Sequence, residues 1–596
     1  MSQARAWSVA LVGIEGAMVE VEAAISSGLP RTTMVGLPDA ALYEARDRCR
    51  AAMASSGRGW PSDPVTINLS PATLPKAGSH YDLAIAAAVA AAGRKFDPGA
   101  LEGLAIFGEL GLDGRVRTVR GLLPALLAAA RRGFGKAVVP AGQLREAALV
   151  AGLTVFGAAD LADLFDILTG GPGAAPLPPA VPSPPPAAPL DLADVAGQLD
   201  GKWALEVAAA GRHHLYLHGP PGVGKTLLAE RLPGLLPDLE PAEALEVSAI
   251  HSLAGMNLDG GLVRRPPYAD PHHSASIASL VGGGARIAMP GAVSRAHRGV
   301  LFLDEAPEFS PRVMEALRVP LESGRIVLGR AVATATYPAS FQLVLAANPC
   351  PCGMATTPGG NCRCAPMVVR RYASRVSGPI LDRIDIHQHL KPVRAALLRN
   401  AEPGESSQAV AERVWLARER QHHRLEPGGW RTNGEVPGPA LRKRLPLPEG
   451  SDLLDIAVAR AGCRPAASTR CCAWPGRSAT SPGPAARAGT TCAPRWPCVA
   501  APSRSREQRD GRADGPDVPG RCGGARPPGC CRGGRGLRGG TGLGRAGETR
   551  GRPATGQAGA GRATGRAAGP HHRRGHALRH PRRRRMAGSA ARPRRM

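Results

Sequence analysis

Residues 463–596 contain no Ile, Phe, Tyr, Lys or Asn and only three Leu. A segment this poor in large apolar side chains cannot bury enough surface to offset the conformational entropy lost on folding. The composition therefore argues against a folded domain, and we expect these 134 residues to be disordered.

Outside this tail, the chain has little excess charge. The formal net charge is +27 over 596 residues, but the tail holds 29 Arg and five Asp or Glu, a net charge of +24. The first 462 residues carry only +3, so bulk charge there does not indicate a nucleic-acid partner. The tail also holds eight of the thirteen Cys, at no metal-like spacing, and no secretory signal supports disulfides.

The tail is rich in Arg, Ala, Gly, Pro, Cys and Trp, which is typical of a GC-rich gene translated in the wrong frame. We shifted the frame at residue 462 by joining the last base of each codon to the first two of the next. The codons then permit LSARG and, three residues later, VLRVAWTLGDLAG, which is an amphipathic helical sequence. Two interpretations stay open, namely a frameshift after about residue 462 and a genuine basic, disordered tail.

The chain also lacks long apolar runs. None reaches the roughly 18 residues that a membrane-spanning helix needs, and residues 1–5 lead into no signal-peptide core. We therefore expect a cytoplasmic protein with no membrane partner.

Residues 219–226 fit the phosphate-loop pattern G-x-x-x-x-G-K-[ST]. A plausible strand at 214–218 precedes them and a helical run at 227–232 follows, which is the context that this loop requires. The pattern predicts that Lys225 reaches the phosphates of ATP and that Thr226 ligates Mg²⁺. The nucleotide-binding residues would be Gly219, Pro220, Pro221, Gly222, Val223, Gly224, Lys225 and Thr226.

Two apolar runs further along supply the other polar groups of such a site. Residues 300–303 predict a buried parallel strand that ends at Asp304, a second Mg²⁺ ligand, and Glu305, which would polarise the attacking water. Residues 343–347 predict another strand, and Asn348 at its end would orient that water, although an ordinary strand-capping role stays open. Together these residues predict a nucleoside-triphosphatase.

The chain divides by composition into five parts. Residues 1–168 alternate strand-like runs (7–12, 65–69) with helical ones (40–54, 83–92), which predicts an α/β or α+β domain. A Pro/Ala-rich linker (169–190), the ATPase core (191–392), the start of a helical lid (393–462) and the tail follow. Within the core we expect an insert between Lys225 and Asp304 and a β-hairpin over 322–330 and 332–337. The best helix of the lid is expected at 406–421.

Four cysteines form a separate motif, with two C-x-C pairs nine residues apart. In extended chain, residues i and i+2 project to the same side, so each pair can present two sulfurs to a tetrahedral Zn²⁺. The ligands would be Cys350, Cys352, Cys362 and Cys364. A metal-free loop and redox chemistry stay open as alternatives. Cys49 is expected to be packed within a helix.

Several strings together resemble the YifB/ComM family of magnesium-chelatase-like AAA+ ATPases: residues 264–273, 294–309, 347–353 and 377–385. The resemblance covers about residues 5–462 and implies an ATP-hydrolysing ring, a homohexamer. Competence members of this family are DNA helicases, so single-stranded or branched DNA and recombination proteins are the implied partners. By position, Asn348 resembles the sensor-1 residue and Arg383 the arginine finger; the alternative for Arg383 is a surface Arg beside Asp382 and Asp385.

The resemblance also raises alternatives. Residues 74–79 and 114–122 resemble the proteolytic domain of Lon, which has a ribosomal-protein-S5-like fold, but His80 and Leu123 stand at its catalytic Ser and Lys positions. We therefore expect a non-catalytic domain and regard a Ser79–Lys76 dyad as unsupported. A chelatase-type protein-remodelling ATPase and a Lon-like unfoldase stay open. Candidate DNA contacts, or simply solvated surface, are Arg264, Arg265, His272, His273, Arg325 and Arg330.

Overall fold

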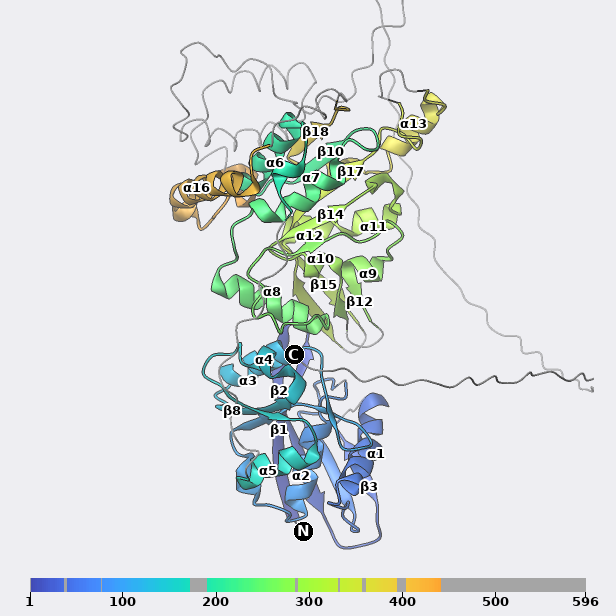
Figure 1. The fold of residues 1–596 in the computed structure, drawn as a ribbon. Coiled ribbons are helices and arrows are strands. Elements are labelled where there is room, and N and C mark those ends of the chain that lie inside the picture. The colour runs from blue at the N-terminus through green and yellow to red at the C-terminus, as the bar shows by residue number, and fades with distance from the viewer. Residues whose placement is uncertain are drawn as a thin grey trace, which may run out of the picture. The chain divides into compact units, whose positions relative to one another are not determined.

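The structure is a computed structural model and describes residues 2–36, 40–76, 78–171, 190–284, 288–330, 333–355, 361–393 and 404–440 (Figure 1). Most of the expected linker, the end of the expected lid and the whole tail lie outside these residues. The expectations for those segments stay predictions.

A seven-stranded mixed sheet organises residues 2–171. Its order is β3-β4-β2-β1-β5-β8-β9, where β1 pairs antiparallel with β2 and β2 with β4, and the other neighbours are parallel. These strands are β1 (Ser2–Val12), β2 (Glu15–Ile25), β3 (Thr32–Val35), β4 (Val65–Ser70), β5 (Leu104–Ile106), β8 (Lys136–Pro140) and β9 (Thr154–Ala158). The principal helices are α1 (Ala40–Ser55), α2 (Asp82–Ala92), α3 (Leu122–Arg131) and α5 (Leu161–Thr169).

Apolar helices cover this sheet. All eleven residues of α2 are buried, and its small Ala side chains let it approach β1 and β2 closely. One cluster joins α1, α2 and α5 to the sheet, and a second joins α3 to Val9, Ala105 and Val139. The strands and helices expected in this part, and the packing of Cys49 in α1, are confirmed.

A five-stranded sheet of parallel strands organises the ATPase part, in the order β11-β14-β17-β10-β18. The strands are β11 (Tyr268–Ala269), β14 (Val300–Leu303), β17 (Gln342–Ala347), β10 (Leu215–His218) and β18 (Ile386–His389). Every residue of β14 and β17 is buried, and alternate side chains enter two different clusters. This two-sided burial explains why residues 300–303 and 343–347 are continuous apolar runs, as expected of central parallel strands.

Helices and the expected insert and hairpin surround this sheet (Figure 1). The helices that follow or precede its strands are α6 (Leu199–Gly211), α7 (Lys225–Arg231), α11 (Pro311–Ala316), α12 (Arg318–Ser323), α13 (Pro366–Ala373) and α14 (Gly378–Leu381). The insert contains α8 (Pro241–Leu253), α9 (Ile277–Val281), β12 (Gly282–Gly283), β13 (Met289–Pro290) and α10 (Ala292–Arg295). The hairpin pairs β15 (Arg325–Gly329) antiparallel with β16 (Thr334–Pro338), as predicted.

The helix expected to begin the lid is α16 (Ser407–Leu425). Ser406 caps it by accepting a hydrogen bond from the backbone N–H of Ala409. Arg413 forms a bidentate ion pair with Glu206 of α6, at 3.0 and 3.1 Å, so α16 is fastened to the ATPase core. Within the described ranges, no helix is both long enough and apolar enough to cross a membrane.

Candidate nucleotide site and cysteine cluster

The phosphate-loop residues connect the end of β10 to the start of α7. A side chain on Gly219 would place its Cβ 2.6 Å from the carbonyl oxygen of Leu390, and Gly224 has a φ of +89°. Position 219 needs glycine because the backbone of Leu390 approaches too closely for a side chain, and position 224 needs glycine because its backbone is left-handed. The sequence therefore allows a tight loop whose backbone can face a phosphate chain.

Lys225 is buried at the centre of this loop, with 8% of its surface exposed. Its Nζ donates hydrogen bonds to the carbonyl oxygens of Gly219 and Pro220, at 2.9 and 3.0 Å, and to Oδ1 of Asn348, at 2.9 Å. Burial lowers the pKa of Lys225, while Asp304 and Glu305 oppose that shift. The Lys225–Asn348 contact joins the loop after β10 to the loop after β17. These loops are neighbours because the two strands are adjacent and parallel.

Thr226 and Asp304 also meet, because β14 ends at the same edge of the sheet. Thr226 Oγ1 donates a hydrogen bond of 2.7 Å to Asp304 Oδ2. A hydroxyl and a carboxylate oxygen so close together suit the shared coordination shell of Mg²⁺, which prefers oxygen ligands. The predicted residues therefore fit ATP and Mg²⁺, with Lys225 for phosphate and Thr226 and Asp304 for the ion.

Glu305, the residue after Asp304, has a strained backbone. Its φ is +50°, in the left-handed region that non-glycine residues occupy at a cost, and such strain is concentrated at functional sites. Its carboxylate lies 3.6 Å from Nδ1 of His273. The sequence suggested His273 as a DNA contact, but the structure places this residue beside the carboxylate expected to polarise water. Sequence reasoning missed this contact, because no spacing rule relates the insert to the end of β14.

Arg383 contacts its own chain. It donates to the carbonyl oxygen of Pro379 at 2.6 Å and forms an ion pair with Glu322 of α12. Asp385 accepts a hydrogen bond from the backbone N–H of His214, at 3.0 Å. An arginine finger acts on the nucleotide of a neighbouring subunit, so its role in this chain stays a prediction.

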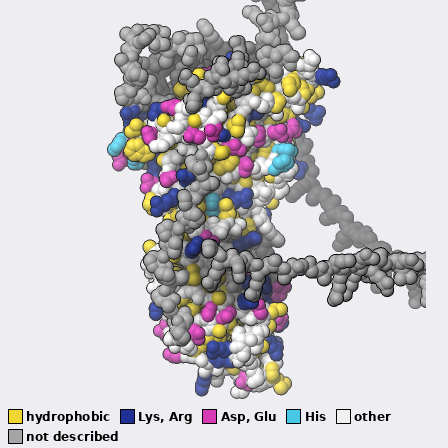
Figure 2. Space-filling model, viewed as in Figure 1, with side chains coloured by type: hydrophobic (Ala, Val, Ile, Leu, Met, Phe, Trp, Pro, Cys, Tyr) yellow, Lys and Arg dark blue, Asp and Glu magenta, His cyan; other side chains and the backbone are white. Residues whose placement is uncertain are grey.

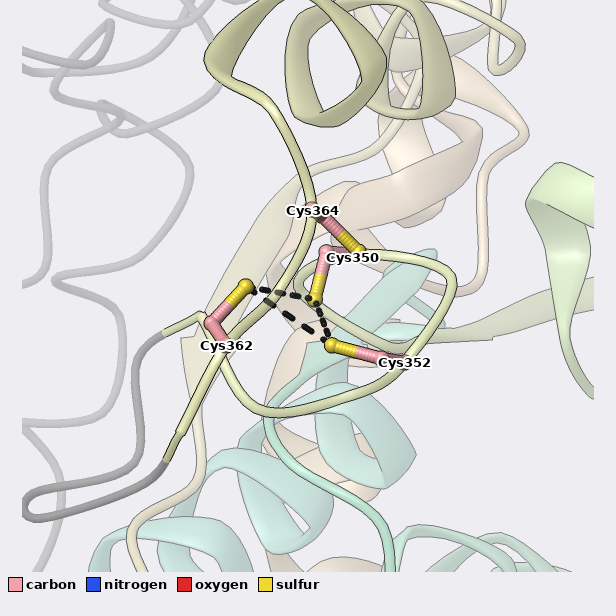
Figure 3. Close-up of side chains that lie close together, drawn as sticks. All are labelled: Cys350, Cys352, Cys362 and Cys364. Carbon is pink, nitrogen blue, oxygen red and sulfur yellow. Dashed lines mark hydrogen bonds between the residues drawn. The ribbon is translucent and has the colours of Figure 1, made fainter.

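The four cysteines of the two C-x-C pairs come together in the loop after β17 (Figure 3). Cys350 Sγ lies 3.3 Å from Cys352 Sγ and 3.8 Å from Cys362 Sγ, and the last two are 3.7 Å apart. With Cys364, the four sulfurs all lie within 4.8 Å of one another. Hydrogen bonds from the backbone N–H of Met354 and with neighbouring thiols lower the pKa of Cys352 to about 6, whereas the pKa values of Cys362 and Cys364 are raised, in part by their contacts with Cys352.

The N-terminal part provides no contact between Ser79 and Lys76 among the hydrogen bonds of its described residues. Lys76 is buried and its Nζ donates to the carbonyl oxygens of Gly36 and Pro71. Ser79 donates to the carboxylate of Glu109. A Ser–Lys dyad requires the amine next to the hydroxyl, and these two side chains bond to other partners. That the domain is non-catalytic stays a prediction.

The remaining candidate DNA contacts are mostly exposed. They are Arg264, Arg265, His272, Arg325 and Arg330. Arg330 also donates to the carbonyl oxygen of Gly284, at 2.9 Å, which ties the hairpin to the glycine run of the insert. On the face shown in Figure 2, acidic and basic side chains of the described residues are intermixed rather than gathered by sign.

Two family models match this chain. Residues 191–398 match magnesium chelatase, subunit ChlI, and residues 21–143 match subunit ChlI of Mg-chelatase. An uncharacterized protein of Mycobacterium tuberculosis is 54% identical over 460 residues, which cover 77% of this chain and 90% of the relative.

Two relatives carry the names suggested by the sequence motifs. Uncharacterized protein YifB of Escherichia coli is 44% identical over 72% of this chain and 84% of its own length. Competence protein ComM of Haemophilus influenzae is 41% identical over 71% of this chain and 84% of its own length. Shorter similarities extend to Lon protease 2 of Bacillus subtilis, over 24% of this chain, and to the magnesium-chelatase 38 kDa subunit of Rhodobacter capsulatus, over 26%.

Proposed function

Because the chain belongs to the YifB/ComM family of magnesium-chelatase-like AAA+ ATPases, we propose that it is a ring motor that uses ATP hydrolysis to move along DNA. The observation that carries the ATPase part is the meeting of Lys225, Thr226, Asp304 and Asn348 at one edge of a parallel sheet. The DNA part is supported by the similarity to a competence protein, and by the resemblance described above to a family whose competence members act as DNA helicases in branch migration.

The described residues suggest a division of roles at the nucleotide. Lys225 binds the β- and γ-phosphates, and Thr226 and Asp304 hold Mg²⁺. Glu305 polarises the attacking water and Asn348 orients it, which requires only a hydrogen bond. Arg383 would leave Glu322 when a neighbouring subunit presents its γ-phosphate, so the ring, expected to be a hexamer, completes each site.

DNA would be held by exposed cations of the insert and hairpin. Arg325 and Arg330 lie at the two ends of β15 and its turn, and Arg264 and Arg265 lie in the insert. Phosphate contacts of this kind give binding that weakens steeply with salt and carries no sequence preference. Recombination proteins as partners and a cytoplasmic location belong to the same proposal.

The proposal is tested on a chain whose reading frame after residue 462 is restored, by measuring ATP hydrolysis and strand displacement with single-stranded and forked DNA. We expect DNA to stimulate hydrolysis, and Arg325→Ala combined with Arg330→Ala to reduce that stimulation while DNA-free hydrolysis persists. The matched control is Arg58→Ala, which removes a cation that stacks on the ring of Phe165 in the N-terminal part. Hydrolysis that responds to an unfolded protein and ignores DNA would favour the unfoldase or chelatase-type alternatives.

The same proposal includes one structural zinc ion held by Cys350, Cys352, Cys362 and Cys364. Zinc–sulfur bonds of about 2.3 Å in a tetrahedron place the sulfurs about 3.8 Å apart, which the Cys350–Cys362 and Cys352–Cys362 distances of 3.8 and 3.7 Å match. Purified protein should therefore contain about one equivalent of zinc per chain. Elemental analysis of protein prepared without chelator measures this, and a metal-free result removes zinc from the proposal.

A further inference from the structure

The cysteine cluster lies directly against the nucleotide-binding loop. We propose that metal binding by the four cysteines clamps the loop after β17 onto the phosphate loop, so that metal occupancy sets the affinity for ATP. This inference rests on the zinc ion of the proposed function. It adds a second role to that ion, because a purely structural zinc would leave nucleotide affinity unchanged.

The first step is the position of Cys350. This residue is buried and lies two positions after Asn348, whose Oδ1 accepts a hydrogen bond from Lys225. A metal–sulfur bond at Cys350 would therefore fix the backbone that presents Asn348 to the phosphate-binding lysine. The strand before it, β17, is wholly buried and provides a rigid anchor on the other side.

The second step is a close contact between the two loops. Gly353 has a φ of +78°, and a Cβ built on it would lie 2.5 Å from Cδ and 2.9 Å from Cγ of Pro221. The backbone N–H of Gly353 donates to the carbonyl oxygen of Cys350, at 2.9 Å, which closes a turn around Cys352. The turn that carries two of the sulfurs thus rests on Pro221, one of the phosphate-loop residues.

The third step is the second pair of sulfurs. Cys362 and Cys364 lie just before α13, whose Tyr372 is buried in the core. A metal joining these sulfurs to Cys350 and Cys352 would close a loop of about a dozen residues, which removes freedom that the chain would otherwise have. Without the metal, the turn at Gly353 would depend on its contact with Pro221 and on weak thiol contacts.

The experiment compares three variants of the full-length chain by zinc content and by equilibrium binding of a fluorescent ATP analogue. Cys362→Ser should lose zinc and bind the analogue about tenfold more weakly, since the clamp opens. Gly353→Ala should keep its zinc but bind the analogue about as weakly, because the added methyl group meets Pro221 and strains a left-handed turn. Cys49→Ser, which replaces a buried thiol in α1, should keep both zinc and affinity.

The outcomes distinguish failure of the proposed clamp from failure of the proposed zinc site. Zinc in the wild-type chain with unchanged affinity in a zinc-free, folded Cys362→Ser protein would overturn the clamp and leave the structural zinc intact. No zinc in the wild-type chain would overturn both. Circular dichroism establishes that the variants are folded, and if Cys362→Ser fails to fold, unchanged affinity in Gly353→Ala overturns the clamp by itself.

Discussion

At the residue scale, substitutions of Lys225 and Glu305 should impair different steps, nucleotide binding in the first case and hydrolysis in the second. Lys225→Ala removes the charge that binds phosphate, so we expect loss of nucleotide binding. Glu305→Gln keeps the shape of the site but cannot polarise water, so binding should persist while hydrolysis falls by about two orders of magnitude or more. Nucleotide binding and steady-state hydrolysis, measured on the same preparations, distinguish the two effects.

Lys95→Ala is the control for removal of a lysine. Its Nζ donates to the carbonyl oxygen of Gly59 in the N-terminal part, away from the phosphate loop in sequence and in its contacts. This variant should bind and hydrolyse ATP like the wild type. Unchanged turnover in Lys225→Ala or in Glu305→Gln would refute the role given to that residue.

Sequence patterns predicted which residues meet at this edge of the sheet, because each of them follows a local rule. A glycine-rich loop between a strand and a helix, or a polar residue at the end of an apolar strand, can be recognised from neighbouring residues alone. The contacts of His273 with Glu305 and of Gly353 with Pro221 follow no such rule. They depend on how the insert and the cysteine loop return to the sheet, which is decided by tertiary packing.

At the scale of secondary-structure elements, a buried glutamine joins β17 to α6. Gln342 Nε2 donates to the carbonyl oxygens of Ala208 and His213, at 3.0 and 2.8 Å, and Gln342 is 1% exposed. Gln342→Leu would leave the His213 carbonyl oxygen without this donor, so the free energy of unfolding should fall by about 1–3 kcal/mol. Denaturant unfolding monitored by circular dichroism measures the change.

Gln408→Leu is the matched control, because Gln408 is exposed on α16 and its side chain bonds to Glu412, one turn further along the same helix. We expect a change within about 0.5 kcal/mol for this surface substitution. An equal loss of stability in the two variants would show that the link between β17 and α6 contributes nothing specific.

Elements were predictable where hydrophobic periodicity was strong. The runs that became β14 and β17 are apolar throughout because both faces of the sheet are covered, and α2 is an almost continuous run of small apolar residues. Strand order was not predictable. The pairing of Trp7 with Ala105 joins residues almost a hundred positions apart, and local sequence does not encode such a partnership.

At the scale of the whole molecule, the relatives bear on the tail. The alignments with the Mycobacterium, YifB and ComM proteins leave 10–16% of each relative and 23–29% of this chain unmatched. A frameshift after about residue 462 stays a prediction, since an out-of-frame segment and a genuine tail peculiar to this chain would both be unmatched. Resequencing the gene around the codon for Gly462 tests it, and an unbroken frame with the tail peptides detected in cells would support a genuine basic tail instead.

The last prediction compares the chain as written with a frame-restored version. Residues 1–462 retain Lys225, Asp304, Asn348 and Arg383, but the helical sequence expected to continue the lid, which begins with LSARG, would be encoded only out of frame. We expect the chain as written to bind ATP weakly and to be nearly inactive as a ring motor, because it would lack most of the lid that closes over the nucleotide and couples adjacent subunits. The frame-restored chain should hydrolyse ATP and displace strands of branched DNA.

DNA binding alone does not distinguish these two chains. The tail carries a net charge of +24, so it can hold phosphates non-specifically with a steep dependence on salt. ATP-driven strand displacement requires coupled subunits and is therefore the informative measurement, with Glu305→Gln in the frame-restored chain as the hydrolysis-dead control. Equal displacement by both chains would show that the lid is dispensable and that residues 463–596 have been misinterpreted.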